Sequence, residues 1–184
     1  MILLAHIGDY WFVPAPLESH HWFGAGFLFV GVLLVAESLA GGVWFRSRLR
    51  AAIWPAGAMF MGEGLIVVAA LDPAGRVIHF SVGLLVLVAG WLELRYRLGL
   101  ASRFSTDVVV VPALLGSGFE MGVIHAHGAM MAAASHVALG LTATGMAGVR
   151  VLQARNPSSF ALYLSMGLLV ITLALILLVF DPGG

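Results

Sequence analysis

Long apolar runs separated by short polar segments dominate the pattern of this chain. Six of these runs are long enough to cross a bilayer as helices, which takes roughly 20 apolar residues each. The predicted membrane helices cover His21–Phe45, Ala51–Leu71, Val77–Arg95, Asp107–Ile124, Met130–Val151 and Phe160–Phe180. The segments between them are too short for a separate domain, so residues 1–184 are predicted to form a single membrane domain.

The composition supports a membrane location. Hydrophobic residues make up 61% of the 184 residues, charged residues make up 10%, and the mean hydropathy is +1.03. A soluble domain of this length needs more polar surface. We therefore predict an all-α integral membrane protein, a six-helix bundle built from three helical hairpins in a lipid bilayer. Met1–Ala5 lack a basic segment, so no removable signal peptide is expected there.

The basic residues predict an orientation. All nine are arginines, and the absence of lysine excludes a retinal Schiff base. Eight lie at one side of the predicted bundle, namely Arg46, Arg48, Arg50, Arg95, Arg97, Arg103, Arg150 and Arg155, whereas Arg76 lies at the other. The positive-inside rule places the eight in the cytoplasm. Both termini are then predicted to lie outside, in a prokaryotic plasma membrane.

A four-residue pattern occurs twice in the apolar part of the chain. Pro55, Glu63, His79 and Gly83 are followed, 57 residues later, by Pro112, Glu120, His136 and Gly140. His21 precedes His79 by 58 residues and adds a third histidine. Ionisable groups are costly in hydrocarbon, so their repetition indicates a site assembled from equivalent helices. The last predicted helix has neither Glu nor His, and it is expected to close the bundle without a ligand.

The repeated residues predict a metal site in the outer half of the membrane. Imidazole suits Cu, Zn, Fe and Ni, while a carboxylate either binds the ion or orients a ligating histidine. The candidate ligands are His21, Glu63, His79, Glu120, His125, His127 and His136. Copper is favoured over zinc or iron because Met121, Met130 and Met131 lie nearby and thioethers select Cu(I). The absence of cysteine excludes tetrathiolate zinc and iron–sulfur sites.

Other ionisable residues of the predicted helices have a structural interpretation. An ionisable residue in a membrane helix often serves only as an interhelical hydrogen bond, and Glu37, which has no repeat partner, is equally open to that role. Glu93 is expected to pair with Arg95 or Arg97 at the membrane boundary.

Two repeated glycines also have two interpretations. Gly83 and Gly140 each follow a histidine of the repeat by four residues, so they share its helix face. Glycine at such a position admits a neighbouring helix, which is the default interpretation. The alternative is room for the edge of a single haem b held by two axial histidines.

Three short runs resemble the eukaryotic transmembrane protein 45 family. They are Gly62-Glu-Gly-Leu-Ile66, Arg76-Val-Ile-His79 and Phe119-Glu-Met-Gly122, the last followed by His125 and His136. The resemblance covers the first five predicted helices, whereas that family has seven helices against six here. It implies a polytopic membrane fold and supports the glutamate and histidine positions. It implies no reaction.

Three functional classes follow from these observations. The first is a membrane metalloprotein that handles copper or another transition metal or uses it in redox chemistry. The second is a haem b or quinone-linked electron carrier, and the third is a structural subunit of a larger membrane complex. No nucleotide-binding glycine motif or basic patch for nucleic acid is present. Whether the protein is an enzyme, and which residues would be catalytic, stay open.

Overall fold

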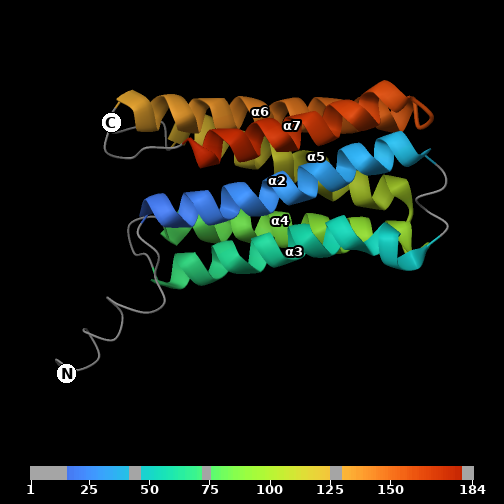
Figure 1. Cartoon of the computed structure of the whole chain (residues 1–184), viewed down its shortest axis with the longest axis horizontal. Coiled ribbons are helices and arrows are strands. Elements are labelled where there is room, and N and C mark those ends of the chain that lie inside the picture. Colours follow the sequence, from blue (N-terminus) through green and yellow to red (C-terminus); the bar gives the residue numbers. More distant parts are fainter. Residues whose placement is uncertain (1–15, 42–46, 72–75, 125–129, 180–184) are drawn as a thin grey trace.

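The computed structural model describes residues 16–41, 47–71, 76–124 and 130–179. These ranges contain six long helices and no strand. The helices are α2 (Pro16–Ala40), α3 (Arg48–Leu71), α4 (Arg76–Arg97), α5 (Arg103–Phe119), α6 (Met130–Arg155) and α7 (Phe160–Leu178), and a π-helical turn, η2 (Glu120–Ile124), follows α5. Figure 1 shows them lying side by side along the long axis of a single bundle.

All six predicted membrane helices are present. Each is long and apolar enough to cross a bilayer. The fourth, which is rich in glycine, starts at Arg103 rather than at Asp107, and Ser102 caps it by accepting a hydrogen bond from the backbone N–H of Ser105. The predicted continuation of the first helix to Phe45 lies largely outside the described residues, since α2 ends at Ala40.

The surface and the interior have the polarity expected of a membrane protein. Large apolar side chains cover the outside, for example Trp22 at 72% exposure and Phe29 at 58%. Several charged side chains are buried instead, and Glu37, Glu93 and Arg150 are each less than a tenth exposed. Apolar surface of this extent belongs in lipid, and ionisable residues in membrane helices face the bundle interior.

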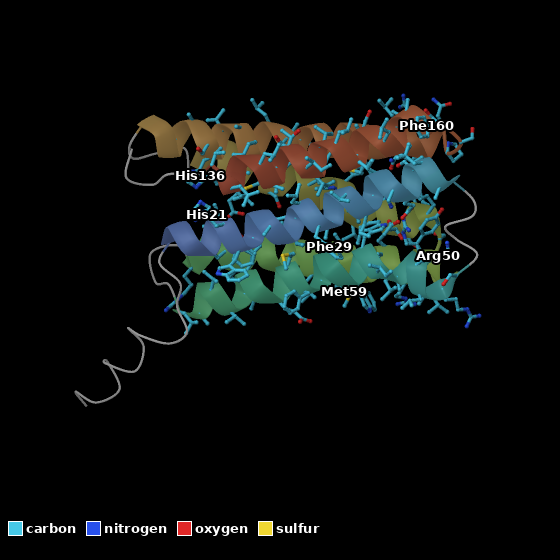
Figure 2. The ribbon with its side chains drawn as sticks, viewed as in Figure 1. His21, Phe29, Arg50, Met59, His136 and Phe160 are labelled. Carbon is cyan, nitrogen blue, oxygen red and sulfur yellow. The ribbon has the colours of Figure 1, made fainter. Side chains whose placement is uncertain are left out.

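The two ends of the bundle differ in their residues. Helices α2, α4 and α6 begin at one end, which we name the histidine end, and Figure 2 shows His21 and His136 there. Arg50 and Phe160 lie at the opposite end, which we name the arginine end.

Glycines bring the helices together in close pairs, and the first two pairs coincide with the sequence repeat. A Cβ atom added to Gly62 of α3 would lie 2.7 Å from the carbonyl oxygen of Gly83 in α4. In the second copy, a Cβ atom on Gly140 of α6 would lie 2.6 Å from the carbonyl oxygen of Gly118 in α5. Such distances exclude any side chain, so helix backbone fills the space beside Gly83 and Gly140.

The third close pair joins the first and last described helices. A Cβ atom on Gly31 of α2 would lie 3.0 Å from the backbone nitrogen of Ile171 in α7, and one on Gly167 would lie 2.9 Å from that of Val35. The closest packing therefore joins α2 to α7, α3 to α4 and α5 to α6. It does not follow the predicted hairpins, which paired α2 with α3, α4 with α5 and α6 with α7.

Candidate functional site

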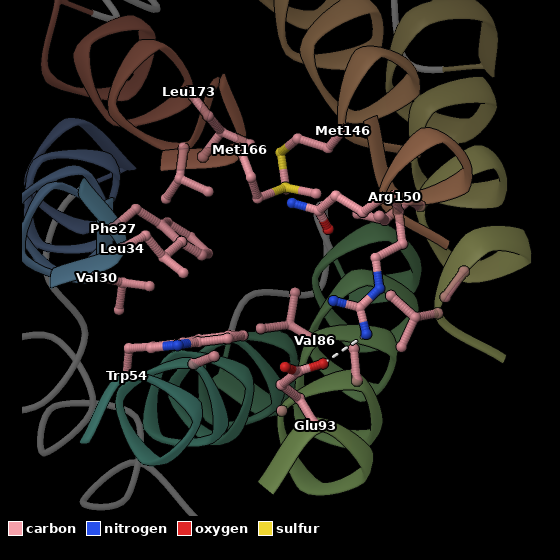
Figure 3. A pocket seen from close by; sticks show the side chains of 18 of the residues that line it. Phe27, Val30, Leu34, Trp54, Val86, Glu93, Met146, Arg150, Met166 and Leu173 are labelled. Atoms are coloured by element: carbon pink, nitrogen blue, oxygen red, sulfur yellow. Dashed lines mark hydrogen bonds and ion pairs between the residues drawn. The ribbon is translucent and has the colours of Figure 1, made fainter. Parts of the chain in front are cut away.

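A pocket of about 160 Å³ lies between the three helix pairs, and all six helices contribute to its lining. Its wall is mostly apolar and includes Phe27, Val30, Leu34, Trp54, Val86, Met146, Met166 and Leu173 (Figure 3). Its polar lining lies toward the arginine end and includes Glu37, Glu93, Arg97, Arg150, Gln153 and Tyr163. The pocket thus has an apolar part and a strongly polar part.

Glu37 and Arg97 form the first link of an ionic network at the polar part. Two nitrogens of the Arg97 guanidinium donate to the two oxygens of Glu37, at 2.8 and 2.7 Å. The indole nitrogen of Trp54 donates to the same carboxylate at 2.9 Å, and the guanidinium lies 4.6 Å from the centre of the Trp54 ring. The two parallel hydrogen bonds to Glu37 and the cation–π contact with Trp54 hold the Arg97 guanidinium in one orientation.

Glu93 carries the network from α4 to α6. Its Oε1 accepts a hydrogen bond from Nε of Arg97 at 2.9 Å, and its Oε2 accepts one from Nη2 of Arg150 at 2.6 Å. Nε of Arg150 also donates to Asp107 at 2.6 Å. The other oxygen of Asp107 accepts a hydrogen bond from Arg103 at 2.9 Å. Glu93 and Asp107 therefore each lie between two arginine side chains.

Gln153 connects the network to the remaining helix. Its side-chain oxygen accepts a hydrogen bond from Arg103 at 3.2 Å, and its nitrogen donates to the backbone oxygen of Leu162 in α7 at 3.1 Å. The links Glu37–Arg97, Glu93–Arg150 and Gln153–Leu162 each join two different helix pairs. The network therefore connects all three helix pairs at the arginine end of the pocket, and the close packing of α2 on α7 joins its two ends.

The ionic network is electrically balanced. Its three arginines face three carboxylates, Glu37, Glu93 and Asp107, so the formal charges sum to zero. A buried charge is tolerated only when it is paired and its remaining donors or acceptors are bonded. This balance explains how so many charged groups occupy the interior of an apolar bundle.

The central ion pair joins equivalent positions of the sequence repeat. Arg150 follows Glu93 by the same 57 residues that separate the repeated glutamates and histidines. The two copies thus carry opposite charges at one position, and these charges meet across the bundle at 2.6 Å. This relation is visible in the sequence, but only once the repeat is extended beyond its apolar members.

The sequence analysis identified part of this network. The predicted pairing of Glu93 with Arg97 is confirmed, and so is the interhelical role considered for Glu37. Arg97, Arg103 and Arg150 were interpreted as loop charges that set the orientation, whereas each forms ion pairs inside the bundle. Asp107 received no role at all. The missed signal was the presence of acids at matching depth on neighbouring helices.

The predicted metal ligands that the structure describes lie toward the histidine end, where His79 lies beside His20, a histidine outside the predicted ligand set. The ring centres of His20 and His79, on α2 and α4, are 6.4 Å apart in an edge-to-face arrangement. The side chains of His79 and His136 are partly buried, while that of His21 is exposed.

The two repeated glutamates have different environments. Both oxygens of Glu120 lie 2.7 Å from the hydroxyl of Ser81 in α4, which donates to this carboxylate. Glu120 opens the π-helical turn η2, a form found frequently at functional sites. Glu63 is exposed, because the neighbouring Gly62 is the residue of this segment that packs against α4. The repeat therefore does not place its two carboxylates equivalently.

A complete ligand set is absent from the part of the chain that the structure describes. There, no group of three or more His, Asp or Glu residues lies close enough to hold a metal ion. His125 and His127 lie outside the described residues. His21 and Glu63 are exposed, whereas His79, Glu120 and His136 are partly buried.

Comparisons with family models, curated proteins and solved structures give no match for this chain.

Proposed function

We propose that this chain is an integral membrane protein that binds a small, mostly apolar molecule carrying one polar group in the pocket between its three helix pairs. The observation that supports this is the two-part lining, in which apolar side chains such as Val30 and Leu34 give way to Glu93 and Arg150. Ligand sites combine apolar walls with a few placed polar groups in this way. Ionisable residues inside a membrane protein are also markers of function.

The size of the pocket sets the size of the ligand. Its volume of about 160 Å³ is close to that of a cavity of about 150 Å³ that holds one benzene molecule. It is smaller than the roughly 300–1,000 Å³ typical of sites for drug-sized compounds. The ligand, or the part of it that enters the pocket, is therefore the size of one substituted ring or a compact pair of fused rings.

The repeated architecture favours a binding site at this place. Membrane proteins built from internal repeats often bind their ligands where the repeats meet. Here the repeat copies form the pairs α3–α4 and α5–α6, and the pocket lies between them and the third pair.

Fluorescence of the pocket tryptophan provides the test. The protein would be purified into phosphatidylcholine nanodiscs and titrated with menadione, 2-methylnaphthalene, decanoate and decylamine. Binding in the pocket should change the emission of Trp54, and the Trp54→Phe variant should lose that part of the signal. If none of the four compounds changes this emission, the proposed function is wrong.

A matched pair of alanines tests the location. Ala58 lines the pocket, whereas Ala56 on the same helix is exposed. Ala58→Phe should fill the pocket and abolish binding, while Ala56→Phe should bind as the wild type does. Equal binding by both variants would place the ligand elsewhere and contradict the proposal.

We propose metal handling as the second candidate function, with copper favoured over zinc or iron. The approach of the His20 and His79 rings from two helices supports it, since imidazoles are the commonest ligands of these ions. Metal analysis of the purified protein and of the His79→Ala, His136→Ala double variant tests it. Full metal occupancy in the double variant would exclude the site.

The haem b alternative has less support, because helix backbone fills the space beside Gly83 and Gly140 that a porphyrin edge would need. A role as a structural subunit would follow if the protein bound neither metal nor any of the four small molecules.

We also propose that the arginine end faces the cytoplasm and that both termini lie outside. Arg97, Arg103 and Arg150 are engaged in buried ion pairs and carry less weight as orientation signals. Five other arginines still lie on that side, Arg46, Arg48, Arg50, Arg95 and Arg155, against Arg76 on the other. This bias supports the orientation through the positive-inside rule.

A further inference from the structure

We infer that the ligand is uncharged and presents a carbonyl oxygen on a flat ring, as the head group of a quinone does, and that Arg150 and Tyr163 are the residues that recognise this oxygen. The inference rests on the proposed function, because it names the class of molecule that the pocket accepts.

The charge of the pocket excludes an ionic ligand. The charged lining residues are two glutamates and two arginines, Glu37, Glu93, Arg97 and Arg150, whose formal charges cancel. A carboxylate or an ammonium group added to this balanced set would be a buried charge without a counter-ion. Such a charge is strongly disfavoured away from water, so the polar group of the ligand is neutral.

The hydrogen bonds of the lining show which kind of neutral group is accepted. Arg150 uses Nε and Nη2 to bind Asp107 and Glu93, while its Nη1 donates to no acceptor among the described residues. Figure 3 shows this guanidinium beside the pocket, next to Glu93. A guanidinium donates hydrogen bonds and accepts none, so a ligand group that bonds to Arg150 must be an acceptor.

Tyr163 and Gln153 are the next polar residues of the pocket lining. The hydroxyl of Tyr163, which also lines the pocket, makes no hydrogen bond with another described residue. Gln153 already uses both ends of its amide, with Arg103 and with the backbone of Leu162. Arg150 therefore offers a donor and Tyr163 a hydroxyl that can also donate, and one carbonyl oxygen on the ligand can accept from both.

The apolar wall favours a flat ring. Phe27, Trp54, Met146 and Met166 pack around the buried cluster of Val30, Leu34 and Val170. Aromatic rings and thioethers contact flat ring systems favourably, and the pocket has room for only one or two such rings. A sugar or a polar head group with many hydroxyls would leave most of its hydrogen-bonding groups unsatisfied against this wall.

Competition between two compounds of similar shape tests the chemical class. Menadione carries two ring carbonyls, and 2-methylnaphthalene has the same ring system and methyl group without them. Menadione should quench the fluorescence of Trp54. 2-Methylnaphthalene should displace menadione, but it should bind at least about tenfold more weakly, because it cannot accept hydrogen bonds from the charged Arg150. Decanoate and decylamine should displace menadione only at far higher concentration.

A pair of tyrosines tests the recognition residue while every charged side chain of the ionic network is kept, and both tyrosines interact with Arg103. Tyr163→Phe removes only the pocket hydroxyl and should weaken menadione binding several-fold, while 2-methylnaphthalene binding stays unchanged. Tyr96→Phe is the matched control, since Tyr96 contacts Arg103 outside the pocket lining. It should bind menadione as the wild type does.

The outcomes separate the inference from the proposed function. Equal affinity for menadione and 2-methylnaphthalene, stronger binding of decanoate or decylamine, or no effect of Tyr163→Phe would overturn the inference and leave a pocket for another class of ligand. Binding that Ala58→Phe does not affect, or no binding of any compound, would overturn the proposed function itself.

Discussion

The two ends of the bundle treat their ionisable residues differently. At the arginine end, Glu37, Glu93 and Arg150 are buried and bonded to partners on other helices. At the histidine end, Glu63 and His21 are exposed, and Glu120 is held by the neutral hydroxyl of Ser81. The first region is a buried network of opposite charges, whereas in the second Glu63 and His21 lie exposed.

The difference shows that burial follows from the availability of a partner. A carboxylate in a membrane interior is stable when a guanidinium reaches it with good geometry. The arginine end supplies three arginines and three acids at matching depth. At the histidine end, the hydroxyl of Ser81 donates to Glu120 instead, and Glu63 stays exposed. Repetition of a residue type in the sequence is therefore weaker evidence for a site than the presence of complementary types.

Removing Arg150 should have the largest effect. Arg150→Ala leaves Glu93 and Asp107 without one of their ion-pair partners, so we expect a loss of about 3–5 kcal/mol in the free energy of unfolding. Arg155→Ala on the same helix is the control, because Arg155 is exposed and its loss should change little. Thermal unfolding in detergent would measure both. Similar unfolding temperatures for the two variants would show that the network contributes no stability.

The glycine contacts should give the next largest effect. Gly140→Ala places a methyl group against the backbone of Gly118 and Gly122, and overpacking of this kind costs about 1–3 kcal/mol. Gly148→Ala on the same helix meets no atom within 4 Å and should be neutral. The same unfolding assay compares them, and a Gly140→Ala protein as stable as the wild type would argue against this close pairing of α5 with α6.

The repeated glutamates should differ by a smaller amount. Glu120→Gln weakens the interaction with Ser81, for which we expect a cost of about 1 kcal/mol. Glu63→Gln changes an exposed side chain, so its effect should stay within about 0.5 kcal/mol. A larger loss for Glu63→Gln than for Glu120→Gln would reverse our comparison of these positions.

Orientation can be tested with no expected effect on stability. A cysteine introduced at Ser47 should resist an impermeant thiol reagent in intact cells, whereas one at Ala74 should react, because the arginine end is proposed to face the cytoplasm. Permeabilised cells serve as the control, in which both should react. The reverse labelling pattern would place the ionic network near the outer surface.

The sequence by itself determined the helices and the local contacts. Long apolar runs indicate six membrane spans because hydrocarbon requires every backbone group to be bonded within the chain. Glu93 and Arg97 are four residues apart on one helix, so their pairing follows from helix geometry alone. The glycines of the repeat likewise indicated close helix contacts.

Only the tertiary structure decided which side chains face one another. Successive residues on a helix point about 100° apart, so the packing of Gly62 against α4 leaves the adjacent Glu63 outside. Glu37 and Arg97 are 60 residues apart, and they can pair only if their helices, α2 and α4, place both side chains at the same depth in the bundle and turn them toward each other. The glycine contacts help to set these rotations within each helix pair, because the face that carries the glycine must point at the partner helix. The pocket and its balanced charges exist only once that arrangement has formed.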